Sequence, residues 1–385
     1  MGQRVFGALP GNDQRWTGVG DIGMTQEKKG ANVQIRNLVK RFGDVLAVDN
    51  ISLGIEHGEF ITLLGPSGSG KTTTLMVIAG FEVPDRGEIL IDDESILFTP
   101  AYKRGIGMVF QNYSLFPHMT VERNIGFPLR MRKVEKEERV NKIRQVLELV
   151  KLPGYEKRFP RQLSGGQQQR IALARALVFN PYVLLMDEPL GALDKKLREH
   201  MQLEIKQITQ SLNITVIYVT HDQTEAMTMS DRIAVMNEGR FEQIGPPAEI
   251  YDNPRNYFVA DFIGESNFIK GKIEKTRDQT CCFISEGGLR FNAFSNQEKL
   301  AGKEGYLVIR PEKISLVEQG QSFSNQFEVM IEEAAYLGDI TLLRATSVQD
   351  ETMLTIRQQN KFINRPVKKG EKVTIGWNEK DNCIV

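Results

Sequence analysis

The stretch FITLLGPSGSGKTTTLMVIAG, residues 60–80, decides the fold because three local patterns follow one another in it. It begins with a compact apolar run at 60–64, which is typical of a strand buried in a parallel sheet. A glycine-rich turn follows, and the apolar residues from position 74 onward continue as a helix. A buried strand that is joined to a helix by a glycine loop predicts an α/β fold.

The loop GPSGSGKTT, residues 65–73, matches the P-loop pattern G-x-x-x-x-G-K-[ST] and has the flanking strand and helix that this motif requires. Its glycines let backbone amides approach phosphate groups, and the amino terminus of the helix adds a positive dipole end. Lys71 is expected to neutralise the β- and γ-phosphates, and Thr72 to offer its hydroxyl to Mg²⁺. The residues predicted to bind ATP here are Gly65, Pro66, Ser67, Gly68, Ser69, Gly70, Lys71, Thr72 and Thr73.

Three further apolar runs, at 182–188, 215–221 and 232–236, predict more strands of the same parallel sheet. The carboxyl ends of such strands meet at one edge of the sheet, where α/β proteins bind ligands. At that edge Asp187 is expected to hold Mg²⁺, and Glu188 to orient an attacking water as a general base. Runs at 32–42 and 47–60, by contrast, have the half-alternating pattern of an open antiparallel sheet.

A second glycine loop, LSGGQQQR at 163–170, needs a separate explanation. Ser164 and Gln167 fit a capping box at the start of a helix. A cap does not explain Gly165 and Gly166, because glycine in the first turn lowers helix stability. Bare amides at a helix amino terminus form a phosphate site. The sequence therefore predicts a second phosphate cradle, far along the chain from the first.

Helical and strand patterns divide the rest of the chain. A stripe of Val140, Ile143, Val146, Leu147 and Val150 predicts a helical insertion, and a similar stripe follows Asp194. Beyond about residue 260, short strands separated by glycine, asparagine and charged turns predict a small antiparallel barrel at 261–385. Residues 1–30 show no periodicity and are expected to be a flexible tail, with Met24 as an alternative start.

Composition narrows the class of protein. A chain of 385 residues is expected to hold two domains, and its 49 Lys plus Arg equal its 49 Asp plus Glu, so no bulk positive charge points to nucleic acid. The three cysteines, Cys281, Cys282 and Cys383, have no metal-binding spacing and fit a reducing compartment. The start of the sequence lacks the charged-then-apolar pattern of a signal peptide, and no apolar run reaches about 20 residues, so neither a signal peptide nor a membrane span is expected.

The order of the motifs over residues 31–260 resembles the ATP-binding cassette (ABC) family of transport ATPases: P-loop, glutamine loop VFQNYSLFPHMT (109–120), LSGGQ, MDEP, GALD (191–194) and TH. This resemblance implies a RecA-like core with an antiparallel subdomain and a helical subdomain at about 115–175. In that family two cassettes stack head to tail, and the LSGGQ loop of one covers the ATP bound at the P-loop of the other. A second copy of the chain is therefore an expected partner, and its ATP site is completed by Ser164, Gly165, Gly166 and Gln167.

The resemblance also assigns roles to four single residues. It implies that Phe42 stacks on adenine, although an ordinary core phenylalanine stays an alternative. Gln111 is expected to sense Mg²⁺ and the lytic water, and His221 to hold the γ-phosphate beside Glu188. Asp194 lies in the GALD loop, which in the family crosses the dimer interface beside the nucleotide; the first residue of that loop is more often serine.

The segments PPAEIYDNPRNYFVADFIGESNFI (246–269), VIRPEKISL (308–316) and YLGDITLLRA (336–345) resemble the OB-like, TOBE-type barrel of importer ATPases. The segments at 227–245, 261–267 and 375–381 look most like the spermidine/putrescine branch, with ferric ion, sugars, glycerol phosphate or sulfate as alternative solutes. The resemblance implies two integral-membrane permease subunits and an external solute-binding protein as partners, at the cytoplasmic face of the inner membrane.

Two alternatives of other classes stay open. One is a soluble ABC ATPase that acts on ribosomes or DNA, but such proteins usually carry two cassettes or a long coiled-coil insertion, which this sequence lacks. The other is a nucleic-acid-binding barrel, which calls for exposed aromatic residues among basic ones. Only RFNAFSNQEK (290–299) and KFINRPVKK (361–369) approach that pattern, so nucleic acid is not expected as a partner.

Overall fold

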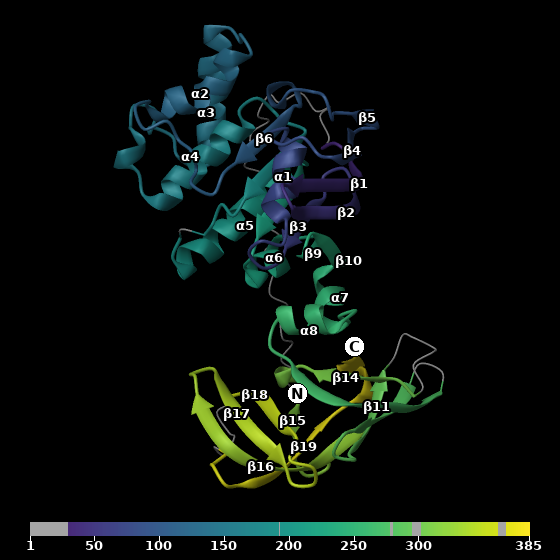
Figure 1. Ribbon diagram of the computed structural model, residues 1–385. Helices are drawn as coiled ribbons and strands as arrows, with labels where there is room; N and C mark the ends of the chain where they lie inside the picture. The colour runs from purple at the N-terminus through teal and green to yellow at the C-terminus, as the bar shows by residue number, and fades with distance from the viewer. Residues whose placement is uncertain (1–29, 192, 278–279, 295–301, 361–366) are drawn as a thin grey trace, which may run out of the picture.

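The computed structural model describes residues 30–191, 193–277, 280–294, 302–360 and 367–385. The expected N-terminal tail, apart from residue 30, lies outside these described residues. Figure 1 shows an α/β part and a β part, which are joined by two short helices, α7 and α8. The predicted combination of an α/β cassette with a following all-β domain is confirmed.

The centre of the cassette is a six-stranded sheet in the order β10-β9-β3-β8-β7-β6. Five strands are parallel, and β10 is antiparallel to β9. Its strands are β3 (Phe60–Leu64), β6 (Ile106–Val109), β7 (Val183–Asp187), β8 (Thr215–Thr220), β9 (Arg232–Asn237) and β10 (Arg240–Gly245).

Both faces of this sheet are buried, which explains the continuous apolar runs in its strands. In β7, Leu184 and Met186 pack into the core that includes the helical insertion. The alternate residues Val183 and Leu185 face the core beneath a second sheet. That sheet is antiparallel, in the order β2-β1-β4-β5, and comprises β1 (Val33–Phe42), β2 (Val45–Ile55), β4 (Arg86–Ile91) and β5 (Glu94–Ser95).

In Figure 1, α2, α3 and α4 of the helical insertion form one group. The helices of the cassette are α1 (Lys71–Ala79), α2 (Val121–Met131), α3 (Lys136–Leu149), α4 (Gly165–Leu177), α5 (Lys195–Leu212), α6 (Gln223–Met229), α7 (Pro247–Asp252) and α8 (Tyr257–Phe262). The predicted stripe on α3 is confirmed at Ile143, Val146 and Leu147, but Val140 is 41% exposed and lies outside the packed face. No helix among the described ranges is both long and apolar enough to cross a membrane.

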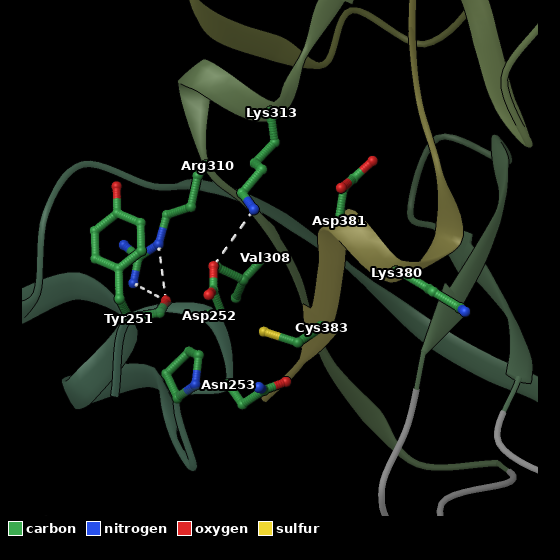
Figure 2. Close-up of a pocket in the computed structure, with 10 residues that line it drawn as sticks. Tyr251, Asp252, Asn253, Val308, Arg310, Lys313, Lys380, Asp381 and Cys383 are labelled. Carbon is green, nitrogen blue, oxygen red and sulfur yellow. Dashed lines mark hydrogen bonds and ion pairs between the residues drawn. The ribbon is translucent and has the colours of Figure 1, made fainter. Parts of the chain in front are cut away.

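The cassette and the C-terminal strands meet around Arg310, which is 4% exposed. Its Nη2 donates to the carbonyl of Tyr251 at 2.8 Å, and its Nη1 donates to the carbonyl of Ala260 at 3.1 Å. Figure 2 shows this arginine beside Tyr251, with an ion pair of 3.4 Å between Lys313 and Asp252 close by. A buried guanidinium whose donors reach backbone carbonyls therefore ties the C-terminal domain to the last two helices of the cassette.

The C-terminal domain contains the predicted barrel and, in addition, a second sheet. The barrel is closed, and one of its strand pairs is parallel, whereas an antiparallel barrel was expected. The barrel runs β11-β12-β13-β20-β14, and its strands are β11 (Asn267–Arg277), β12 (Thr280–Ser285), β13 (Arg290–Phe294), β20 (Asn382–Ile384) and β14 (Glu304–Ile309). The second sheet has the order β15-β19-β16-β17-β18, formed by β15 (Ser315–Leu316), β19 (Lys372–Trp377), β16 (Asn325–Tyr336), β17 (Ile340–Ser347) and β18 (Met353–Gln359).

One core holds the barrel and this sheet together, and Trp377 lies at its centre with 0% exposure. The indole stacks on Phe291 of the barrel at 5.7 Å between ring centroids, with 17° between the planes. It also meets the ring of Phe327, from the second sheet, edge to face at 5.7 Å. Aromatic pairs in these geometries stabilise a core beyond the area that they bury.

We expect Trp377→Ala to lower the free energy of unfolding of the C-terminal domain by about 3–5 kcal/mol, because it leaves a large cavity between two packed layers. Hydrogen exchange of the amides in β16 and β19 measures this loss. Tyr336→Ala is the matched control, since that side chain is 75% exposed on the same sheet. Equal protection in the two variants would contradict the shared core.

Candidate nucleotide-binding site

A cavity of about 470 Å³ opens above the loop between β3 and α1. Carboxyl ends of the parallel strands supply one side of it, and the start of β2 supplies another. Its lining consists of Val45, Leu46, Ala47, Ser67, Gly68, Gly70, Lys71, Thr72, Thr73, Glu188 and Glu238. Most of the predicted P-loop residues are therefore brought together at one hollow.

The glycines of the loop are required by its backbone and by close neighbours. Gly68 and Gly70 have φ angles of 81° and 98°, a region that side chains with a Cβ rarely adopt. A Cβ at Gly70 would lie 2.3 Å from the carbonyl oxygen of Ala47, and one at Gly65 would lie 2.1 Å from that of Met236. The loop therefore lies close against the start of β2 and the end of β9.

Lys71 is held inside this loop and is 5% exposed. Its Nζ donates to the carbonyls of Gly65 at 2.8 Å and Pro66 at 2.7 Å. Burial lowers the pKa of Lys71, and the charges of Glu188 and Asp187 oppose that shift. A buried ammonium whose acceptors are neutral carbonyls is poorly compensated, so a phosphate group is the partner that this position favours.

Thr72, which lines the cavity, is hydrogen-bonded to Asp187, which is buried and does not itself line the cavity. The hydroxyl of Thr72 donates to Oδ1 of Asp187 at 3.0 Å. Burial raises the pKa of Asp187, as does the nearby Glu188, while the Thr72 hydrogen bond lowers it. In the described part of the chain no three His, Cys, Asp or Glu side chains gather as a metal site. One hydroxyl and one carboxylate fit Mg²⁺, which takes oxygen ligands and completes its shell with phosphate and water.

Glu188 is held by side chains from two neighbouring strand ends. His221, after β8, has its Nδ1 3.0 Å from Oε1 of Glu188. Gln111, after β6, donates from Nε2 to Oε2 of Glu188 at 3.2 Å. Each oxygen of the carboxylate is therefore oriented by its own neighbour.

The backbone of Glu188 is in the left-handed region, with φ of 43°, which a glutamate adopts only when its surroundings impose it. Its N–H donates to the carbonyl of Val219 at 2.9 Å, which ties it to β8. The side chain is 20% exposed and borders the cavity. Such placement is suited to a base that takes a proton from a bound water.

The second glycine loop lies elsewhere. Ser164 accepts from the amide of Gln167 at 3.4 Å, and Gln167 Oε1 accepts from the amide of Ser164 at 3.0 Å, so the predicted capping box is confirmed. No residue of 164–167 lines the described wall of the P-loop cavity. Asp194 caps α5 through the amide of Leu197 at 3.0 Å. Within one chain, these residues therefore do not line the P-loop cavity.

Phe42 is 46% exposed, so it is not an ordinary core phenylalanine, and Lys40 lies over its ring with Nζ 4.8 Å from the centroid. It pairs in register with Val45, which lines the cavity although Phe42 itself does not.

Sequence reasoning missed Val45, Leu46, Ala47 and Glu238 as lining residues. No local pattern marks them, because their place at the cavity depends on the pairing of β2 with β1 and of β10 with β9.

Comparison with known proteins agrees with the motif order. Residues 48–191 match the family model of the ABC transporter, and residues 307–385 match that of the TOBE domain. The chain is 46% identical over 367 residues to the spermidine/putrescine import ATP-binding protein PotA of Rubrobacter xylanophilus. This alignment covers 94% of this chain and 96% of the relative. The protein of the same name from Trichodesmium erythraeum is 44% identical over 373 residues, with 94% and 97% covered.

A solved structure is similar to the cassette alone. It is the dimeric, post-hydrolysis state of the ATP-binding cassette MJ0796 bound to ADP and Pi, with a TM-score of 0.50 and 35% identity. The match covers 56% of this chain and 98% of that chain. The family resemblance is thereby confirmed. Identity of this size over nearly the full length of two relatives, together with both matched domains, shows that the chain belongs to the ABC transporter family, as an ATP-binding cassette followed by a TOBE domain.

Proposed function

We propose that this chain is the ATP-hydrolysing subunit of an importer for the polyamines spermidine and putrescine. The observation that carries the ATPase role is Glu188, whose two carboxylate oxygens are held by Gln111 and His221 at the edge of a P-loop cavity. The solute is supported by the names of the relatives that match almost the whole chain.

The working unit is a head-to-tail dimer. In one chain the residues of the second glycine loop do not line the P-loop cavity. That loop begins a helix, whose amino-terminal amides can bind a phosphate, but the P-loop of the same chain does not present one to it. A second copy, whose loop at 164–167 closes over the first cavity, supplies what each half-site needs. The dimeric form of the cassette MJ0796 supports this arrangement.

In the proposed reaction, the P-loop amides and Lys71 bind the phosphates of ATP. Thr72 and Asp187 would hold Mg²⁺, which would neutralise negative charge on the phosphates when bound. Glu188 accepts the proton of the attacking water, while His221 and Gln111 hold its two oxygens in place. ATP closes the dimer because only ATP contacts both chains, and loss of the γ-phosphate lets it open.

The chain's other partners follow from this role. Two integral-membrane permease subunits would carry the solute, and an external binding protein would deliver it, with this chain at the cytoplasmic face of the membrane. The segment after Gln111 is the proposed contact to the permease subunits. Nucleic acid is not a proposed partner, and adding RNA to the purified protein should leave its mobility unchanged.

The test is uptake of radiolabelled putrescine and spermidine by host cells in which this gene is replaced by variants. Lys71→Ala is expected to abolish uptake of both, because ATP can no longer be bound productively. Lys272→Ala, an exposed lysine of the barrel that pairs with Glu304, is the control and should transport normally. Normal polyamine uptake in Lys71→Ala would contradict the proposal that polyamines are the transported solute. Uptake of ferric ion and of organic solutes would then be measured in the same pair of strains.

A further inference from the structure

A small pocket lies where the end of α7 meets the C-terminal domain, and it shares no lining residue with the P-loop cavity. Its volume is about 180 Å³, whereas one water molecule needs only about 10–15 Å³. Residues 251–254 line it from the cassette. From the C-terminal domain it is lined by Val308, Arg310, Lys313, Lys380, Asp381 and Cys383. We call this the junction pocket (Figure 2), and walls from two domains are common around ligand sites.

The guanidinium of Arg310 brings a buried positive charge to the junction pocket. Among the residues that the structure describes, no carboxylate forms an ion pair with it, and its acceptors include the neutral carbonyls of Tyr251 and Ala260. Burial lowers the pKa of Arg310, yet an arginine stays protonated in a protein. A buried cation that is held by neutral acceptors alone favours an anion beside it.

One N–H group of Arg310 remains available to such an anion. Nε and Nη2 both donate to the carbonyl of Tyr251, at 3.3 and 2.8 Å. Nη1 shares its two hydrogens among acceptors at 260–266. A guanidinium has five N–H groups, of which two are on Nη2. The second hydrogen of Nη2 therefore has no acceptor within the described ranges.

Lys313 brings a second cation to the same pocket. Its Nζ lies 3.4 Å from Oδ1 of Asp252, and the two side chains are 38% and 47% exposed. Exposed ion pairs of this kind contribute little to stability, because water competes for both charges. An anion that contacts both Lys313 and Arg310 can therefore displace Asp252 at low cost.

The remaining polar groups of the junction pocket do not oppose an anion. Oδ2 of Asp381 already accepts from the amide of Asn378 at 2.9 Å. Burial raises the pKa of the Cys383 thiol to about 11, so this group is neutral near pH 7. Lys380 adds a third cation to the lining, against the two carboxylates of Asp252 and Asp381. The excess of positive charge favours an anionic ligand over a cationic one.

We propose that the junction pocket binds a small oxyanion of the size of phosphate or sulfate, between Nη2 of Arg310 and Nζ of Lys313. The anion supplies the counter-charge that Arg310 lacks. Because the pocket has walls from both domains, an occupied pocket holds α7 and the C-terminal domain together more firmly than an empty one. This binding depends neither on ATP hydrolysis nor on the transported solute.

The experiment is calorimetric titration of the full-length chain with sodium phosphate and, separately, with sodium sulfate, at constant ionic strength. All variants carry Lys71→Ala, so that differences between them do not come from the P-loop. Lys313→Gln should weaken binding of both anions at least about fivefold, because one charge-assisted hydrogen bond is lost. Asp252→Asn should strengthen it, since the change frees Lys313 and removes a negative charge.

Lys272→Gln is the matched control. Lys272 is an exposed lysine of the barrel that pairs with Glu304 and does not line the junction pocket, so its replacement should leave the affinity for phosphate unchanged. Hydrogen exchange gives a second readout: phosphate should slow exchange of the amides in α7 in the Lys272→Gln chain and much less in the Lys313→Gln chain.

Three outcomes overturn the proposal. One is the absence of saturable binding of either anion in the chain that carries Lys71→Ala alone. Another is equal affinity in Lys313→Gln and Lys272→Gln. The third is tighter binding in Lys313→Gln together with weaker binding in Asp252→Asn, which would mean that the anion binds elsewhere on the chain. None of these outcomes bears on the proposed ATPase, because no nucleotide is present in the titration.

Discussion

Replacement of Glu188 by glutamine is expected to leave ATP binding intact and to lower the turnover number of ATP hydrolysis by about 10²–10⁴-fold, the usual contribution of a general base. The amide can still accept from one neighbour, so the side chain keeps its place between Gln111 and His221. It cannot take a proton from water. Because ATP then persists between the two chains, the variant should accumulate as a dimer.

Two measurements check this expectation: single-turnover hydrolysis of labelled ATP, and gel filtration with and without Mg-ATP. Glu148→Gln is the control, since this glutamate is exposed on α3 and should behave as wild type in both. Hydrolysis at the wild-type rate in Glu188→Gln would exclude Glu188 as the base. The assignment would then move to another group at the cavity.

Lys71→Ala should weaken ATP binding by at least about 10–100-fold, the range expected when charge-assisted hydrogen bonds to a phosphate are lost. The truncation removes the only cation of the cavity's described lining and leaves the carbonyls of Gly65 and Pro66 without this donor. Calorimetric titration with Mg-ATP measures the change in Kd.

Lys71→Arg tests whether positive charge alone is enough for ATP binding at this position. It keeps the positive charge but has to fit a larger, planar group where the lysine is only 5% exposed. We expect an affinity between those of wild type and Lys71→Ala. Wild-type affinity in Lys71→Ala would show that the loop amides alone hold the phosphates, and it would remove the lysine from the proposed mechanism.

The features that the sequence alone predicts are those set by neighbours along the chain. The strand, loop and helix around Lys71 follow from an apolar run, glycines and a helical pattern within residues 60–80. The capping box at Ser164 depends on residues only three positions apart. Propensity, capping and turn chemistry act over such short distances, so one sequence is enough to predict them.

Other features depend on pairing between distant segments. The four residues of β6 are too short a run to be predicted, yet β6 delivers Gln111 to Glu188, 77 positions away. The second sheet of the C-terminal domain is similar: its strands were expected, but their separation from the closed barrel is decided by strand register and by packing on Trp377. Short apolar runs do not specify their partners, because register is set by burial and turn geometry.

The site combines both kinds of information. Local sequence predicted which residues are candidates to bind phosphate, to hold Mg²⁺ or to take a proton: the P-loop, Asp187 and Glu188. Only the tertiary structure decided that Gln111 and His221 hold the two oxygens of Glu188, and that Val45 and Glu238 wall the cavity. The physical reason is that the parallel sheet brings the ends of β6, β7 and β8 to one edge, and no spacing along the chain encodes that meeting.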